Sequence, residues 1–191
     1  MLVGYPKLRT LDDHTLLYAL INIVVRLLVW VLPVFVYLRY FERVKPSAYL
    51  KLTQHWRRGL LFAIGFSTLN LLAALVQHGW PQLRPGAVTW NSILSTSLLI
   101  GFVEEIPYRG LIFQKLNEWF SFPVASLISS LLFLAIHLPG WLSLHLFTLH
   151  NAIFVFVFGI VMTVLLRLSQ SLWAPIVSHS LNDFFSAVLF H

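Results

Sequence analysis

Acidic side chains are rare in this sequence, and three of them stand where charge is costly. The chain has seven Asp and Glu residues among 191, and Glu104, Glu105 and Asp183 fall inside apolar stretches. A charged group at mid-bilayer costs about 2.5 to 3.5 kcal/mol on insertion scales, so such residues usually face a bundle interior and serve a function. These carboxylates and the histidines near them are therefore the first candidates for chemistry.

The densest polar cluster spans residues 101–110 and reads GFVEEIPYRG. Glu105 and Arg109 are four residues apart, the spacing at which opposite charges meet on one helix face. Glu104 points about 100° away from them, so we expect it to face a cavity and to act as a general base. Pro107 removes a backbone donor, which predicts a local kink. The structural alternative is a Glu–Arg pair that only locks two helices together.

Two histidines also lie at helical spacing from residues that could orient them. The Asp183 carboxylate can bond one nitrogen of His179, fix its tautomer and leave the other nitrogen directed at a substrate, a water or a metal. Asn182 can share that role, and His137 shares a helix face with Phe133. The structural alternatives are a packed histidine at His137 and an interhelical polar clamp in the second pair.

Three further polar residues receive no role from the sequence. Arg26 lies within the first apolar stretch, where it can snorkel or pair with an interior acid. His145 and His150 flank the start of the fifth stretch, near the expected outer interface.

Cysteine is absent, which excludes disulfides, thiolate metal ligands and a cysteine nucleophile.

Apolar segments must position all of these residues. The chain is 58% hydrophobic and 10% charged with a mean hydropathy of +0.79, whereas a soluble domain is about 25% charged. Since a spanning helix needs roughly 20 apolar residues, we expect an all-α, polytopic transmembrane bundle of about six helices and no separate soluble domain. The apolar stretches fall near residues 16–38, 59–76, 91–119, 123–138, 142–168 and 172–190.

Two of these stretches have unusual lengths. A single helix over residues 91–119 would be about 43 Å long, more than the roughly 30 Å hydrocarbon core, and Glu104 would sit near its middle. The fourth stretch lies between Pro123 and Pro139, which predicts a helix of about 15 residues, short for a full crossing. We therefore expect His137, at its C-terminal end, to lie below the membrane surface.

The formal charge of +6 is explained by membrane topology, because the basic residues bracket apolar stretches and form no solvated basic face. The loop after the first stretch has a large basic excess over its one acid, Glu42, which predicts a cytoplasmic loop and an outward-facing N-terminus. Its basic residues are Arg39, Arg43, Lys45, Lys51, Arg57 and Arg58. Nucleic acid is not an expected partner.

Three motifs follow one another across successive stretches. They are Glu-Glu-x-x-x-Arg at 104–109, Phe-x-x-x-His at 133–137 and His-x-x-x-Asp at 179–183, with Ser-Leu-Trp-Ala-Pro-Ile before the last histidine. In combination they resemble the CPBP family of intramembrane proteases, the CAAX-processing and bacteriocin-processing (Abi) group related to the type II CAAX prenyl endopeptidase. The resemblance covers about half the chain, near residues 90–187. It implies N-terminal helices with a basic cytoplasmic loop over 1–89 and a catalytic helical core over 90–191.

The resemblance also implies roles. Glu104 and His137 would activate a water, and His179 with Asp183 would stabilise the tetrahedral oxyanion, while the Glu–Arg pair orders the first motif. The family commonly has Asn at the Asp183 position and Phe where Tyr108 stands, so this chain carries an extra negative charge. The implied substrate is a membrane-associated protein or peptide, and the implied location is the inner membrane of a bacterial cell.

The chemistry of water activation stays open at this point. Glu104, His137 and His179 could hold Zn²⁺ with one open position, or Glu104 could work as a metal-free base. The sequence contains no His-Glu-x-x-His, Gly-x-Gly-Asp or Gly-x-Ser-x-Gly motif, so the Glu/His set is its only complete protease constellation.

Two functions of other classes compete with proteolysis. Intramembrane Glu and His residues also build proton relays, as in a proton-coupled transporter, although the chain has no matching Gly-interrupted halves. A non-catalytic membrane factor, for bacteriocin self-immunity or as a scaffold, is the other alternative.

Overall fold

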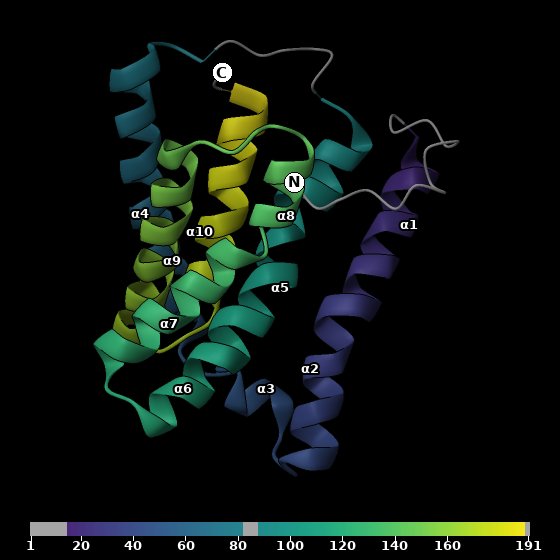
Figure 1. Ribbon diagram of the computed structural model, residues 1–191, viewed down its shortest axis with the longest axis vertical. Helices are drawn as coiled ribbons and strands as arrows, with labels where there is room; N and C mark the ends of the chain where they lie inside the picture. Colours follow the sequence, from purple (N-terminus) through teal and green to yellow (C-terminus); the bar gives the residue numbers. More distant parts are fainter. Residues whose placement is uncertain (1–14, 82–87, 190–191) are drawn as a thin grey trace.

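The structure is a computed structural model that describes residues 15–81 and 88–189, and every regular element in these ranges is a helix. The predicted all-α bundle is confirmed, and its helices coincide with the six apolar stretches (Figure 1). The first run comprises α1 (Leu16–Arg26), η2 (Leu27–Val31), α2 (Leu32–Val36) and η3 (Tyr37–Phe41), where η denotes π-helical geometry. The short α3 (Pro46–Tyr49) and the long α4 (Trp56–His78) follow.

The third run comprises η5 (Asn91–Leu98), α5 (Ile100–Glu105), η6 (Ile106–Phe113) and α6 (Gln114–Trp119). The remaining helices are α7 (Phe122–Ala135), α8 (Leu138–Ser143), α9 (Leu149–Ser169), α10 (Trp173–Phe184) and η7 (Phe185–Leu189). Within the described ranges, four runs are long and apolar enough to cross a membrane: Leu16–Phe41, Trp56–Gln77, Phe122–Ser143 and Leu149–Ser169. The other two runs, the third and the sixth, carry the acids and the last histidine of the motifs.

The third run changes helical geometry next to the predicted site. The N–H of Leu99 donates to the carbonyl of Leu94 five residues earlier, at 3.0 Å. Further along, α5 gives way to π geometry at Ile106, directly before Pro107. Proline has no N–H for an α-helical hydrogen bond, and π turns commonly occur at functional sites. The irregularity expected at Pro107 is therefore present as a change of hydrogen-bond register.

Close packing between α5 and α10 brings two of the motifs together. A Cβ atom at Gly101 would overlap the carbonyl oxygen of Ile176 and would lie 2.6 Å from Oγ of Ser180. The Ser180 hydroxyl also donates to the carbonyl of Leu98, at 3.0 Å. Because no side chain separates the two backbones here, Glu104 lies opposite His179.

The fourth run is longer than its flanking prolines predicted: α8 begins at Leu138 and continues through Pro139, so the run reaches Ser143 and is long enough to cross a membrane. The helix α7 has 14 residues, and His137 lies at its junction with α8. A hydrogen bond of 2.5 Å between the hydroxyls of Ser126 and Thr163 joins α7 to α9. This contact fixes the part of α7 that leads to His137.

The first run lies at the edge of the bundle, inclined to the other helices (Figure 1). Only 11% of its most apolar window is buried within the protein, so most of its surface is left for lipid. Its inner side packs against η5 and α5, which places part of α1 beside the third run. Helices from residues 1–89 and from residues 90–191 pack together in one bundle. The predicted division between these two parts stays a prediction.

Candidate active site

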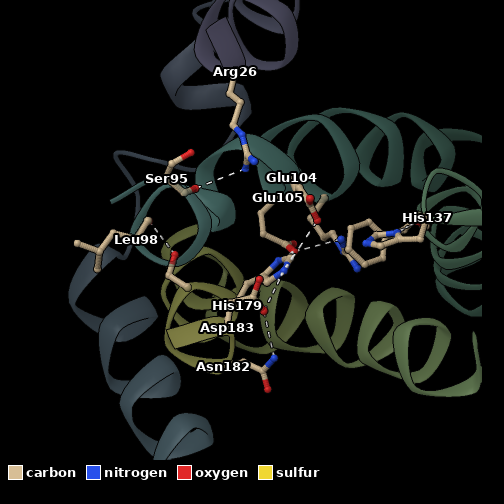
Figure 2. A network of polar contacts seen from close by, with 12 residues as sticks. Arg26, Ser95, Leu98, Glu104, Glu105, His137, His179, Asn182 and Asp183 are labelled. Carbon is tan, nitrogen blue, oxygen red and sulfur yellow. Dashed lines mark hydrogen bonds and ion pairs between the residues drawn. The ribbon is translucent and has the colours of Figure 1, made fainter. Parts of the chain in front are cut away.

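The motif residues line one cavity of about 140 Å³ between the helices. Its polar lining includes Arg26, Glu104, His137, His179, Asn182 and Asp183, and its apolar lining includes Phe133, Phe154 and Phe158. These side chains come from α1, α5, α7, the junction of α7 and α8, α9 and α10. Figure 2 shows the polar residues converging from separate helices on the space between Glu104 and His179.

A fully buried ion pair lies behind this cavity. The Nη1 atom of Arg109 lies 3.1 Å from Oε1 of Glu105, and neither side chain has any exposed surface. The same Oε1 atom lies 2.6 Å from Nδ1 of His179. Glu105 therefore links Arg109 to the imidazole, a contact that helical spacing within one element did not predict.

The expected partner of His179 is consequently different. Oδ1 of Asp183 is 3.8 Å from Nε2 of His179, beyond hydrogen-bond distance, and it receives a 3.3 Å bond from the amide of Asn182. The four-residue spacing correctly placed Asp183 on the same helix face as His179. The residue bonded to Nδ1 of His179 is nevertheless Glu105, because α5 and α10 are in close contact. In this structure the nitrogen that sets the tautomer is bonded to Glu105, and Nε2 is left facing the cavity.

Glu104 lies opposite that nitrogen. Its Oε2 atom is 3.9 Å from Nε2 of His179, and the residue is 7% exposed. The hydrogen bonds among the described residues leave the Glu104 carboxylate without a direct donor, so a molecule in the cavity can reach it. This is the orientation that the sequence predicted. One residue along an α-helix is a rotation of about 100°, so Glu104 points away from the side on which Glu105 meets Arg109.

His137 is oriented by its own helix. Its Nδ1 atom lies 2.8 Å from the carbonyl oxygen of Phe133, and because a carbonyl only accepts, Nδ1 carries the proton and Nε2 is a free acceptor. The Phe133 ring packs edge-on against His137, with 4.9 Å between ring centroids. On its other side the guanidinium of Arg109 lies 4.1 Å from the centre of the same ring. Phe133 thus connects the buried ion pair to the position of His137.

Sequence reasoning missed two contributors to the site. Phe158, on α9, packs edge-on against His179 with 4.9 Å between ring centroids, but its apolar surroundings gave no signal of that role. Arg26 did give a signal, a charge within a span, without indicating its partner. His145 and His150 are exposed and do not line the cavity.

The residues present do not fit the zinc site considered from the sequence. In the described ranges, no three His, Asp or Glu side chains are grouped closely enough to hold a metal ion. Nδ1 of His179 is bonded to Glu105 and Nδ1 of His137 to a backbone carbonyl, so only the two Nε2 atoms could reach a metal, and the spacing of the three side chains is what argues against the site.

Comparison with known protein families matches residues 86–185 to the family described as type II CAAX prenyl endopeptidase Rce1-like. No curated protein and no solved structure matches the chain. The matched segment is more than half of the chain and contains all three motifs. With its apolar helices, the match identifies an integral membrane protein from a group of endopeptidases. The chain belongs to the Rce1-like family of type II CAAX prenyl endopeptidases, as its motifs indicated.

Proposed function

We propose that this protein hydrolyses a peptide bond of a membrane-associated protein or peptide, using a water activated by Glu104 and His137. The observation that carries the proposal is the convergence of Glu104, His137 and His179 on one cavity from three separate helices. The family supports endopeptidase activity in general. The buried carboxylate and imidazoles supply the base and the donor that such a reaction needs.

The first step adds water to the scissile carbonyl. The Glu104 carboxylate removes a proton from the water, and Nε2 of His137 accepts a hydrogen bond from it and orients its lone pair. The water oxygen forms a bond to the carbonyl carbon, and the π electrons move to the carbonyl oxygen. The resulting oxyanion is stabilised by a hydrogen bond from Nε2–H of protonated His179.

The second step breaks the bond to nitrogen. The proton held by Glu104 passes to the leaving amine as the C–N bond breaks and the oxyanion returns to a carbonyl. The products are a carboxylic acid and an amine, and Glu104 regains its charge. Glu105 positions His179 through Nδ1 in both steps, and Asn182 and Asp183 border the oxyanion side of the cavity.

The decisive variant is Glu104→Gln, which keeps the side-chain shape and removes the base. We expect cleavage of a quenched peptide bearing an S-farnesylated cysteine near its C-terminus to fall by about 10² to 10⁴-fold, the usual contribution of general acid–base catalysis. Glu118→Gln is the matched control, because Glu118 is 46% exposed and pairs with Lys115. Full activity in Glu104→Gln would overturn the assignment of the base.

The same assay separates the competing functions. A non-catalytic membrane factor would keep its cellular effect in Glu104→Gln, and a proton-coupled transporter would give flux in liposomes without any cleaved product. Treatment with a zinc chelator decides between the two routes to water activation. Retained cleavage in chelator, together with less than one metal ion per purified chain, supports the Glu104 base, whereas lost cleavage restored by Zn²⁺ contradicts it.

The membrane orientation is part of the proposal. Lys115 lies 2.7 Å from Glu42, and Lys51 lies 3.0 Å from Gln170, so the basic loop, α6 and the end of α9 meet at one end of the bundle. Cytoplasmic loops carry an excess of Lys and Arg, which favours the cytoplasm for this end. The proposed location is a bacterial inner membrane with the N-terminus outside. Labelling of single cysteines placed at the two ends tests this orientation.

A further inference from the structure

An apolar hollow of about 400 Å³ opens on the surface of the bundle, outside the candidate active site. Its lining residues are Leu52, Trp56, Leu60 and Trp173, none of which lines the cavity at Glu104. They come from the loop before α4, the first turns of α4 and the start of α10. Since that loop is the basic one, the hollow lies at the basic end of the bundle, where Figure 1 also shows α3 and α6.

Contacts within the chain fix the shape of this hollow. A Cβ atom at Gly59 would lie 2.7 Å from Oγ of Ser171 and 3.1 Å from Cβ of Trp173, so the first turn of α4 touches the start of α10. The indole N–H of Trp173 donates to the carbonyl of Leu52, at 2.8 Å. The ring of Phe102 packs edge-on against the same indole, with 5.4 Å between ring centroids. The hollow is therefore formed before any partner binds.

The apolar surface continues from the hollow along α4. Trp56, Leu60 and Ile64 follow one another at four-residue spacing, which places them on one face of the helix. Both Trp56 and Ile64 are exposed. Only 17% of the most apolar window of this span is buried within the protein, so the helix is left to contact lipid. A hydrocarbon chain seated in the hollow can thus continue along this row into the membrane.

Two arginines supply positive charge beside the hollow. Arg57 and Arg58 directly follow Trp56 and are exposed, and the guanidinium of Arg57 lies 5.3 Å from the centre of the Trp56 ring. Neither arginine forms an ion pair with a described residue, and the acids described at this end, Glu42 and Glu118, both pair with a lysine of α6. No side chain caps the N-terminus of α4, so the positive end of the helix dipole adds to this charge.

We propose that the hollow and its two arginines bind an anionic phospholipid, with the phosphate at Arg57 and Arg58 and an acyl chain in the hollow. Guanidinium groups match phosphate oxygens with paired hydrogen bonds, and basic pockets between membrane helices bind anionic headgroups. Tryptophan rings are enriched at the membrane interface, where a lipid changes from polar to apolar. A zwitterionic lipid offers the same chains but adds a cation that the arginines repel. The proposal does not depend on the hydrolysis proposed above.

The experiment measures which lipid stays with the purified full chain. The protein in detergent micelles is equilibrated with equal amounts of dioleoyl phosphatidylglycerol and dioleoyl phosphatidylcholine, and the retained lipids are counted by native mass spectrometry. Each basic residue near an anionic headgroup contributes about a fivefold preference, so we expect roughly 25-fold more phosphatidylglycerol. Arg57→Gln with Arg58→Gln should bring the ratio close to one by loss of phosphatidylglycerol alone.

Three controls accompany this measurement. Arg39→Gln with Arg43→Gln removes the same charge at exposed positions of the basic loop and should keep the preference. Unchanged retention of phosphatidylcholine in the Arg57, Arg58 variant reports an intact hollow. Phosphatidylglycerol should also raise the Tm of the wild type more than phosphatidylcholine does, and this variant should lose only the extra rise. Free glycerol phosphate at an equal concentration should not displace the lipid, because it has the charge without the chains.

Several outcomes would overturn the proposal. Equal retention of the two lipids by the wild type is one, and a preference that falls as much in the Arg39, Arg43 variant is another, since it reports only the overall charge. Displacement by glycerol phosphate would indicate a site for a free anion, and a lipid-free dimer in the mass spectrum would indicate that a second copy covers the hollow. None of these measurements needs turnover, so failure here leaves the proposed hydrolysis untouched, and inactive protein can still show the lipid preference.

Discussion

Replacing Glu105 with glutamine should separate the stability of the bundle from the chemistry of its cavity. Glu105 is fully buried, and its Oε1 atom lies 3.1 Å from Arg109 and 2.6 Å from Nδ1 of His179. A glutamine keeps the shape but removes the charge, which leaves the Arg109 guanidinium buried without a counter-ion. Breaking a buried pair in this way costs about 3 to 5 kcal/mol, so we expect the free energy of unfolding to fall by that amount. Cleavage should fall as well, because His179 loses its charged acceptor.

A double variant distinguishes the two effects. In Glu105→Gln with Arg109→Met, the orphaned cation is gone, and replacing both partners of a buried pair is often nearly neutral for stability. We therefore expect most of the unfolding free energy to return, while kcat stays low because Nδ1 of His179 still lacks its carboxylate. Unfolding is followed by tryptophan fluorescence in mixed micelles, and kcat with the quenched peptide.

Clear results would refute this reasoning. If Glu105→Gln unfolds like the wild type, the pair does not carry the stability that its burial implies. If the double variant regains kcat together with stability, Glu105 acts only as a counter-ion to Arg109 and does not position His179. Glu118→Gln again serves as control, since its exposed pair with Lys115 should change stability by less than about 1 kcal/mol.

The remaining predictions concern packing and the second carboxylate of the cavity. Gly101→Ala should lower stability by about 1 to 3 kcal/mol and reduce cleavage, because the added Cβ overlaps the carbonyl of Ile176 and pushes α5 from α10. Gly65→Ala is its control, with open space around the added atom, and equal thermal stability of the two variants would contradict the close contact. Asp183→Asn should keep kcat/KM within about tenfold of wild type, since Asp183 makes no hydrogen bond to His179. A loss as large as that of Glu104→Gln, in the same peptide assay, would reverse the roles given to the two acids.

Sequence patterns predicted what happens within single helices. The apolar stretches gave the six helical runs, of which four in the described ranges have the length and apolar content that a bilayer crossing needs. The four-residue spacing gave the pair of Glu105 and Arg109, and the helical period gave the rotation of Glu104 away from that pair and toward the cavity. The prolines gave the length of α7 and the position of His137 at its end, but they wrongly predicted that the run stops there, since α8 continues it to Ser143.

Contacts between helices could not be read in the same way. The partner of His179 depends on how closely α5 approaches α10, and that distance is set by Gly101, whose absent side chain carries no chemical signal. Phe158 looked like any lipid-facing or core phenylalanine, since periodicity does not say which neighbour a face meets. The alternation of α and π geometry was equally hidden, because Pro107 predicts an irregularity but not its form.

The π-helical segment η6 has a consequence for how this chain can change its length. A π turn holds more residues than an α turn, so the backbone can absorb a one-residue deletion between Ile106 and Phe113 by reverting to ordinary α geometry. Side chains beyond Phe113 would then keep their direction around the axis, because the α turn holds fewer residues than the π turn it replaces. If the lost residue lay between Glu105 and Arg109, the two would be three residues apart instead of four, a spacing that still places them on neighbouring positions of one helix face. A one-residue deletion in η6 should therefore disturb the helices beyond it less than the same deletion in α9, which is α-helical throughout and has no extra residue to give up.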